Sequence, residues 1–216
     1  GISLKNWNAY LHNIKKPLIN KPVQGQYPPG SIYKMITALA GLEKGVIDED
    51  SVFYCPGYYS FGNRIYRCWK RGGHGAVNLK KAIAQSCDVF FYQVGQQVGV
   101  DGLAEIAKKF GLGQKTGLEI EHEKAGLIPT RKWKLQRKNV KWQEGETLSV
   151  AIGQGFNLTT PLQVALMTSM FANGGKKYRP QIVEKVISPD GTTVDKLEPE
   201  LTMEVEGMDE HIELVR

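Results

Sequence analysis

The sequence lacks any run of about eighteen consecutive apolar residues, so no segment is predicted to span a membrane. Its first eleven residues mix polar and aromatic side chains and do not resemble a signal peptide. No internal repeat, low-complexity tract or Gly/Ser-rich linker divides the chain. With an ordinary globular hydrophobic fraction of 41%, residues 1–216 are predicted to form a single domain.

Acidic residues are fewer than basic ones, and the resulting net charge of +6 raises the question of nucleic-acid binding. The basic residues concentrate in residues 131–141, RKWKLQRKNVK. No DNA- or RNA-binding module surrounds this run, so we expect a solvated surface segment and no nucleic-acid partner. Contact with an anionic polymer, a membrane surface or a protein partner is the alternative interpretation.

Cysteine is also scarce: the chain contains only Cys55, Cys68 and Cys87, and an odd number cannot form a complete set of disulfides. Together with His74 they fall within one segment, 55–87, although none of them forms a short C-x-x-C pair. Three thiolates and one imidazole make a sound tetrahedral zinc set, so we predict a structural Zn²⁺ that fastens the 51–87 loop region. One disulfide with a free thiol, and three free thiols, remain open alternatives.

Helical patterns dominate the chain as far as Gly175, and strand patterns come late. The predicted helices are Ser31 to Gly45, Asn78 to Ala84, Val89 to Val98, Leu103 to Phe110 and Thr160 to Asn173. Residues 51–75 are predicted to be irregular, and a β-hairpin is expected over residues 179–196. Helices followed by late strand pairing indicate an α+β fold within the broad α/β class.

A serine and a lysine share the start of the first helix in the motif Ser31-Ile-Tyr-Lys34, after the rigid lead-in Tyr27-Pro-Pro-Gly30. Residues i and i+3 share one helix face, so the Lys34 amine is expected to reach the Ser31 hydroxyl. A serine hydroxyl needs a neighbouring base, and burial at a helix N-terminus favours the neutral amine that can act as one. We predict Ser31 as the nucleophile and Lys34 as its base.

A second polar element, Ser86-Cys87-Asp88, lies much further along the chain, between two predicted helices. A hydroxyl and a carboxylate in such a loop can relay a proton to a leaving group and hold a substrate amide. We therefore predict that Ser86 and Asp88 join Ser31 in a catalytic site. Taken alone, the triplet also fits an ordinary turn with a capping residue.

Together these motifs resemble those of the active-site serine penicilloyl transferases, whose signatures are S-x-x-K, S-D-N and K-T-G. The resemblance extends to elongation-class (class B) penicillin-binding protein 2 over roughly residues 20–180. The segments that carry it are YPPGSIYK (27–34), SCDVFFYQ (86–93), GLIPTRKW (126–133) and GQGFNLTTP (153–161).

This resemblance implies a β-lactamase/D,D-transpeptidase-like fold, with a helical subdomain and part of an antiparallel sheet. It implies a peptidoglycan D,D-transpeptidase in which Ser31 attacks the D-Ala-D-Ala carbonyl of a stem peptide, assisted by its own backbone N–H as an oxyanion donor. β-Lactam antibiotics trap the same serine. No catalytic cofactor is implied.

The resemblance also implies a location and partners. The expected place is the periplasmic or extracytoplasmic face of the bacterial cell membrane, with the membrane anchor outside this chain. The expected partners are the cell-elongation machinery and a SEDS-type glycan polymerase.

The third signature departs from the family pattern. Lys115-Thr116-Gly117 spells K-T-G but follows Ser86 too closely, in a glycine-rich stretch. In the family the triplet lies much further along the chain, on a β-strand. We expect Lys115 to belong to a structural loop and the true triplet to lie beyond Arg216. The domain over residues 1–216 would then be incomplete and weakly active or inactive by itself.

Two other functions remain as alternatives. One is a β-lactamase or β-lactam sensor of the same fold, for which Glu144 and Glu146 are candidate water-activating bases. The other is a non-catalytic, zinc-stabilised interaction module in which Ser31 merely caps a helix. A stable β-lactam adduct on Ser31 would exclude both a β-lactamase, which releases its adduct, and a non-catalytic module, which forms none.

Overall fold

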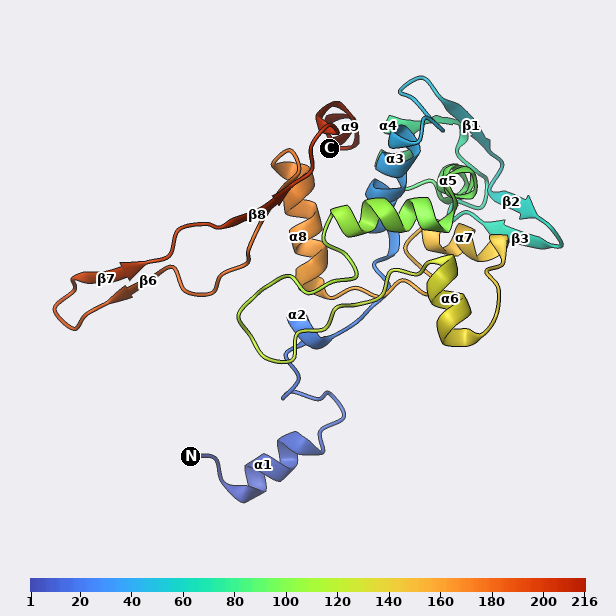
Figure 1. Ribbon diagram of the computed structural model, residues 1–216. Coiled ribbons are helices and arrows are strands. Elements are labelled where there is room, and N and C mark those ends of the chain that lie inside the picture. Colours follow the sequence, from blue (N-terminus) through green and yellow to red (C-terminus); the bar gives the residue numbers. More distant parts are fainter.

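The computed structural model describes residues 1–216 as a helical body with four two-stranded antiparallel sheets (Figure 1). The helices are α1 (Leu4–Leu11), α2 (Lys21–Gln24), the 3-10 helix η1 (Gly30–Tyr33), α3 (Lys34–Glu43), α4 (Leu79–Ala84), α5 (Asp88–Lys109), α6 (Arg131–Lys138), α7 (Glu144–Ala151), α8 (Pro161–Ala172) and α9 (Asp209–Val215). The strands are β1 (Val52–Cys55), β2 (Tyr58–Phe61), β3 (Arg64–Arg67), β4 (Gly75–Asn78), β5 (Lys176–Tyr178), β6 (Lys185–Ile187), β7 (Thr193–Lys196) and β8 (Leu201–Glu204). The predicted combination of helices and antiparallel strand pairs is confirmed.

None of the helices has the length and apolar character that a membrane crossing requires.

The core forms where α5 packs against both α3 and α7. Helix α3 is buried on nearly every side, because small residues such as Ala38 and Ala40 alternate with larger apolar ones such as Leu39. This agrees with the predicted buried helix. Helix α3 continues directly from η1, and Ser31 lies inside η1, where no side chain caps the helix. The start of the buried helix is therefore free to present Ser31 to solvent.

The prediction that residues 51–75 are irregular is wrong for 52–67, which contain three strands, and holds for 68–74, which form no helix or strand. Strand β1 pairs with β4, and β2 pairs with β3, both in antiparallel register. These strands are too short for an alternating pattern to stand out in the sequence. Their order comes instead from packing of half-buried aromatic side chains, such as Phe53 and Tyr66, against the core.

Helix α5 combines the two helices predicted at 89–98 and 103–110. The chain breaks helical geometry only at Gly99, where φ is 76° and ψ is 159°. A break was predicted here, but it is confined to this single residue. Glycine adopts this backbone conformation without a steric penalty, so the helix can resume at once.

The C-terminal part contains the predicted hairpin in a shorter form. Strands β6 and β7 pair around the turn at 188–192 and project away from the body, whereas β5 pairs with β8 nearer to α8 (Figure 1). Helix α9 then returns to the core and packs against α3, where His211 Nδ1 lies 2.6 Å from a Glu43 carboxylate oxygen. The last described helix thus stabilises the helix that follows Ser31.

The basic segment 131–141 forms α6 and is largely exposed, as predicted, with one exception. The Lys134 side chain is buried, and its ammonium lies 2.6 Å from a Glu146 carboxylate oxygen on α7. The rings of Trp142 and Phe156 flank the same ammonium. This lysine therefore joins α6 to α7 and does not contribute to a basic surface.

Backbone hydrogen bonds hold the lead-in to Ser31 against the loop that follows α7. Tyr27 and Thr159 exchange two, of 2.9 and 2.8 Å, and the Gly30 N–H donates to the Gly153 carbonyl at 2.9 Å. A Cβ at position 153 would lie 2.1 Å from the Gly30 carbonyl oxygen, and φ there is +73°. Only glycine fits this close approach, which fixes the turn that carries Ser31.

We predict that Gly153→Ala lowers the free energy of unfolding by roughly 2–4 kcal/mol, through steric contact with Gly30 and an unfavourable φ. Denaturant titration measures the change. The matched control is Gly72→Ala, because a Cβ there meets no atom within 4 Å and φ is ordinary. Equal stabilities for the two variants would contradict the close approach.

Candidate active site

Ser31, Ser86 and Asp88 open into one hollow of about 610 Å³ on the protein surface. They come from separate elements: η1, the loop before α5, and the first turn of α5. Arg67 and Gln154 are also part of its walls. The structure therefore brings together two predicted motifs that are far apart in the sequence.

A continuous chain of hydrogen bonds links the four predicted site residues. The Ser86 hydroxyl donates to the Ser31 hydroxyl at 3.1 Å, and the Lys34 ammonium donates to the Ser86 hydroxyl at 2.9 Å. Lys34 also donates to Asp88 Oδ1 at 2.6 Å. Lys34 makes no direct hydrogen bond to Ser31 in this structure, because its ammonium donates to Ser86 and to the Asp88 carboxylate. Ser86 bridges Lys34 and Ser31.

The ion pair between Lys34 and Asp88 is buried, with side chains only 4% and 13% exposed. The ring of Phe91 lies 5.7 Å from the Lys34 ammonium, and the second Asp88 oxygen accepts the Trp69 backbone N–H at 2.9 Å. Both carboxylate oxygens are therefore hydrogen-bonded, as a buried charge requires. The pair has one fixed geometry beneath Ser31.

Ser86 adopts a backbone conformation that is unfavourable for a residue with a side chain, with φ of +51°. Such strain persists only when surrounding contacts hold it, and it often occurs at functional sites. Here the Ser86 carbonyl accepts from Lys34 Nζ at 2.9 Å and from Trp69 Nε1 at 3.0 Å. These bonds direct the carbonyl and the hydroxyl of Ser86 toward the same ammonium.

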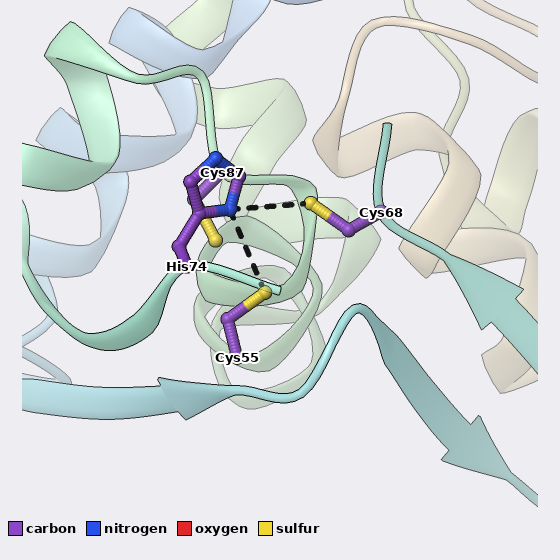
Figure 2. Close-up of side chains that lie close together, drawn as sticks. All are labelled: Cys55, Cys68, His74 and Cys87. Carbon is purple, nitrogen blue, oxygen red and sulfur yellow. Dashed lines mark hydrogen bonds between the residues drawn. The ribbon is translucent and has the colours of Figure 1, made fainter. Parts of the chain in front are cut away.

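The four predicted metal ligands also come together. Cys55, Cys68, His74 and Cys87 are all buried, and their ligand atoms lie within 4.8 Å of one another (Figure 2). Figure 2 shows the His74 ring facing the Cys55 and Cys68 sulfurs, and its Nδ1 lies 3.6 and 3.5 Å from them. All three cysteines are free thiols in the structure, and none forms a disulfide.

The geometry and the chemistry of this cluster fit zinc. Around a tetrahedral Zn²⁺, a cysteine sulfur and a histidine nitrogen lie about 3.6 Å apart, close to the two observed distances. Burial, with a smaller effect of the Lys70 charge, lowers the pKa of His74, which favours the neutral imidazole that binds metals. Burial raises the pKa of the Cys87 thiol to about 12, so this sulfur needs a cation to become a thiolate.

Trp69 connects the cluster to the hydrogen-bonded serines, and sequence reasoning missed it. Its indole N–H donates to the carbonyls of Gln85 and Ser86 at 3.0 Å each, and its ring meets the His74 ring edge to face at 5.4 Å. A tryptophan in a polar loop carries no signal of such a role. Its position directly after Cys68 was the one available clue.

The Lys115-Thr116-Gly117 triplet lies elsewhere, as predicted. Thr116 is buried, and its backbone N–H and hydroxyl donate to the Glu123 carboxylate at 2.7 and 2.6 Å. Lys115 is exposed and does not line the Ser31 hollow. This triplet stabilises a loop.

The two glutamates considered as β-lactamase bases both form ion pairs outside the Ser31 hollow. Glu144 pairs with Arg131 at 2.9 Å, and Glu146 pairs with Lys134. Neither lines the Ser31 hollow. The structure therefore offers no support for either as a water-activating base.

A serine hydroxyl joined through a second serine to a buried lysine is typical of proteins that transfer acyl groups through a serine nucleophile. The family model described as "Penicillin binding protein transpeptidase domain" matches residues 4–214, and the chain belongs to this family.

Comparison with individual proteins confirms the resemblance to penicillin-binding protein 2. The chain is 42% identical over 185 residues to the peptidoglycan D,D-transpeptidase MrdA of Acinetobacter baumannii; this covers 85% of the chain and 28% of that protein. It superposes on penicillin-binding protein 2 of Helicobacter pylori, solved in complex with MreC, with a TM-score of 0.88 and 35% identity. The superposition on penicillin-binding protein 2 of Pseudomonas aeruginosa, solved in complex with WCK 5153, has a TM-score of 0.86 and 38% sequence identity. Both structural matches cover all of this chain and, respectively, 39% and 46% of the solved chains.

We predict that Asp88→Ala lowers the free energy of unfolding by roughly 2–4 kcal/mol, because it leaves the Lys34 charge buried without a partner. Thermal or denaturant unfolding measures the loss. In the control, Glu105→Ala removes an exposed pair with Lys44 and should cost less than about 1 kcal/mol. Adding Lys34→Met to Asp88→Ala should restore part of the loss; if it lowers stability further, the buried-charge explanation fails.

Proposed function

We propose that this chain carries the serine-nucleophile part of a peptidoglycan D,D-transpeptidase site that cross-links stem peptides and is inhibited by β-lactams. The observation that carries the proposal is the hydrogen-bonded chain Ser31–Ser86–Lys34–Asp88 at the base of an open hollow. The function named for the Acinetobacter baumannii relative supports it. Residues 1–216 act in this as one domain, since α9 packs back onto α3.

In the proposed reaction, the Ser31 hydroxyl attacks the carbonyl carbon of the donor peptide's D-Ala-D-Ala bond. As the new bond forms, the Ser31 proton passes to Ser86, a Ser86 proton passes to Lys34, and Lys34 transfers a proton to the Asp88 carboxylate. The Lys34–Asp88 pair then carries one extra proton and a net charge of +1, which is balanced by the negative charge that develops on the oxygen of the tetrahedral intermediate. The Ser31 backbone N–H serves as one oxyanion donor.

The second half of the reaction uses the same groups in reverse. The stored proton returns along the chain to the amine of D-alanine, which leaves as the acyl-enzyme forms. An amine of a neighbouring strand then attacks the Ser31 ester and loses a proton to the same relay. Collapse of the second tetrahedral intermediate returns a proton to Ser31, so the site is regenerated.

We further propose that the cysteine–histidine cluster holds a structural Zn²⁺ through Cys55, Cys68, His74 and Cys87. The ion supplies no catalytic chemistry and would join β1, β3, β4 and the start of α5 at one point. Cys68 precedes Trp69, and Cys87 lies between Ser86 and Asp88. Fixing these two cysteines therefore fixes the backbone that positions Ser86 and Asp88.

The cellular setting is proposed from the resemblance and from the relatives. The Helicobacter pylori relative was solved with MreC, and the Acinetobacter baumannii relative is a peptidoglycan enzyme. We infer a site on the extracytoplasmic face of the bacterial cell membrane, within the elongation machinery and beside a SEDS-type glycan polymerase. Copurification of a tagged full-length natural protein with such a polymerase is the direct test.

We predict that fluorescent penicillin forms a stable adduct on Ser31 in the full-length natural protein. Ser31→Ala should abolish the adduct, and Lys34→Met should slow its formation at least about a hundredfold, because the relay then lacks the amine that passes the proton from Ser86 to Asp88. In-gel fluorescence and peptide mass spectrometry measure both. Ser60→Ala, at an exposed serine on β2, is the control and should label normally.

Three outcomes would count against this assignment. Steady turnover of penicillin would indicate a β-lactamase. Normal labelling of the Ser31→Ala variant would show that Ser31 is not the nucleophile. Labelling that requires Lys115 would show that the exposed K-T-G triplet is catalytic after all.

We predict one zinc ion for each purified chain, measured by elemental analysis. Cys68→Ser should remove most of the metal, and a chelator should lower the melting temperature, because the ion joins four separate segments. The control is His122→Asn, at an exposed histidine outside the cluster, which should retain the metal. Metal-free protein with a disulfide, or with three free thiols and unchanged stability, would contradict the zinc assignment.

A further inference from the structure

A second hollow, of about 320 Å³, lies beside the one that contains Ser31. One wall comes from the β2–β3 hairpin and includes Arg64 and Tyr66. The other wall comes from the first turns of α7 and includes Gly145 and Ser149. Neither the sequence motifs nor the proposed reaction assigns any role to this space.

The two hollows share both of their walls. Along α7, Gly145 and Ser149 line the second hollow, and Ile152 lines the first. Their i, i+4, i+7 spacing places all three on one face of the helix. On the opposite wall, β3 lines the second hollow with Tyr66 and borders the first hollow at its last residue, Arg67.

A direct aromatic contact supports this continuity. The ring of Tyr66 meets that of Tyr92 edge to face at 5.7 Å, and Tyr92 lines the Ser31 hollow. In Figure 1 the β2–β3 hairpin lies beside α7. The two hollows are thus sections of one trough between β3 and α7, which we call the β3–α7 trough.

The trough walls are held at a fixed distance. The Tyr66 hydroxyl donates to the Gly145 carbonyl at 3.0 Å, and a Cβ on residue 145 would lie 2.6 Å from the Tyr66 hydroxyl oxygen. Glycine therefore allows the hairpin to approach the helix this closely. The width of the trough is therefore set by the contact between Tyr66 and Gly145.

The charge in the trough is positive. Arg64, on the same face of β3 as Tyr66, is exposed and has no carboxylate partner. The acidic side chain in the wall, Glu146, is already neutralised by Lys134 at 2.6 Å and also accepts the Gln143 backbone N–H. Free guanidinium groups bind carboxylates through paired hydrogen bonds.

We propose that the β3–α7 trough binds a carboxylate-bearing arm of the peptide substrate, with Arg64 as the carboxylate anchor. The proposal rests on the proposed function, because it assumes that a peptide carbonyl lies at Ser31. Arg64 lies three residues along β3 from Arg67, which is about 10 Å in a strand. An extended peptide in the trough would therefore place a carboxylate about three residues from the reacting carbonyl opposite Arg64.

The test compares acyl transfer from two synthetic peptides by the full-length natural protein. Both end in D-Ala-D-Ala; one has a free carboxylate three residues before the reacting carbonyl, and the other has the corresponding amide. The wild type should favour the carboxylate peptide about fivefold in kcat/KM, mainly through KM, as expected for a partly exposed ion pair. Arg64→Gln should abolish this preference, and Arg64→Glu should reverse it.

The matched control is Arg137→Gln, at an exposed arginine of α6 that makes no ion pair and lies outside the trough. It should keep the wild-type preference. A folding defect in an Arg64 variant would slow both peptides equally, so an unchanged preference in Arg64→Gln overturns the proposal. A wild type that does not discriminate between the peptides overturns it as well.

Acylation by benzylpenicillin separates this proposal from the proposed function. If the wild type forms no adduct on Ser31, the transpeptidase assignment fails, and the trough proposal fails with it. If the adduct forms normally but the peptides are not discriminated, only the trough proposal fails.

Discussion

The arrangement of the site depends on the buried ion pair between Lys34 and Asp88. Each partner also binds a third group: Lys34 donates to Ser86, and Asp88 accepts the Trp69 backbone N–H. Two charges removed from water are stable only while they stay paired and hydrogen-bonded, so any displacement of either side chain carries a large free-energy cost. This constraint holds α3, the start of α5 and the loop after β3 in one relative position. Ser31 lies above the point where they meet.

The cysteine–histidine cluster and the hydrogen-bonded serines form a single structural unit. Cys87 lies between Ser86 and Asp88 in the chain, and Cys68 precedes the residue that donates to both of them. The strained backbone of Ser86, with φ of +51°, is therefore held in place by Trp69, which follows Cys68, and by Cys87, the next residue in the chain. A chain that replaced these cysteines would need another way to keep the Ser86 carbonyl and hydroxyl directed at Lys34.

The fold was predictable where a pattern is local and long. The buried helix after Ser31, the capped helix over 161–172 and the late hairpin each have apolar periodicity or turn residues that can be read directly. The strands within 51–75 were not predictable, because each is too short to give a periodic signal. Their pairing depends on aromatic side chains that pack against α5 and α7, which lie far away in the sequence.

The sequence by itself determined which groups are available: a serine and a lysine one helical turn apart, a Ser-x-Asp triplet, and three cysteines with a histidine. Residue type and spacing are local properties, and they were enough to indicate the family. Only the tertiary structure decided how these groups meet. It interposed Ser86 between Lys34 and Ser31, connected the cysteine cluster to the serines through Trp69, and placed a second hollow beside Arg64. These features depend on distances between segments that lie far apart in the sequence, and such distances are set by packing, which no local pattern encodes.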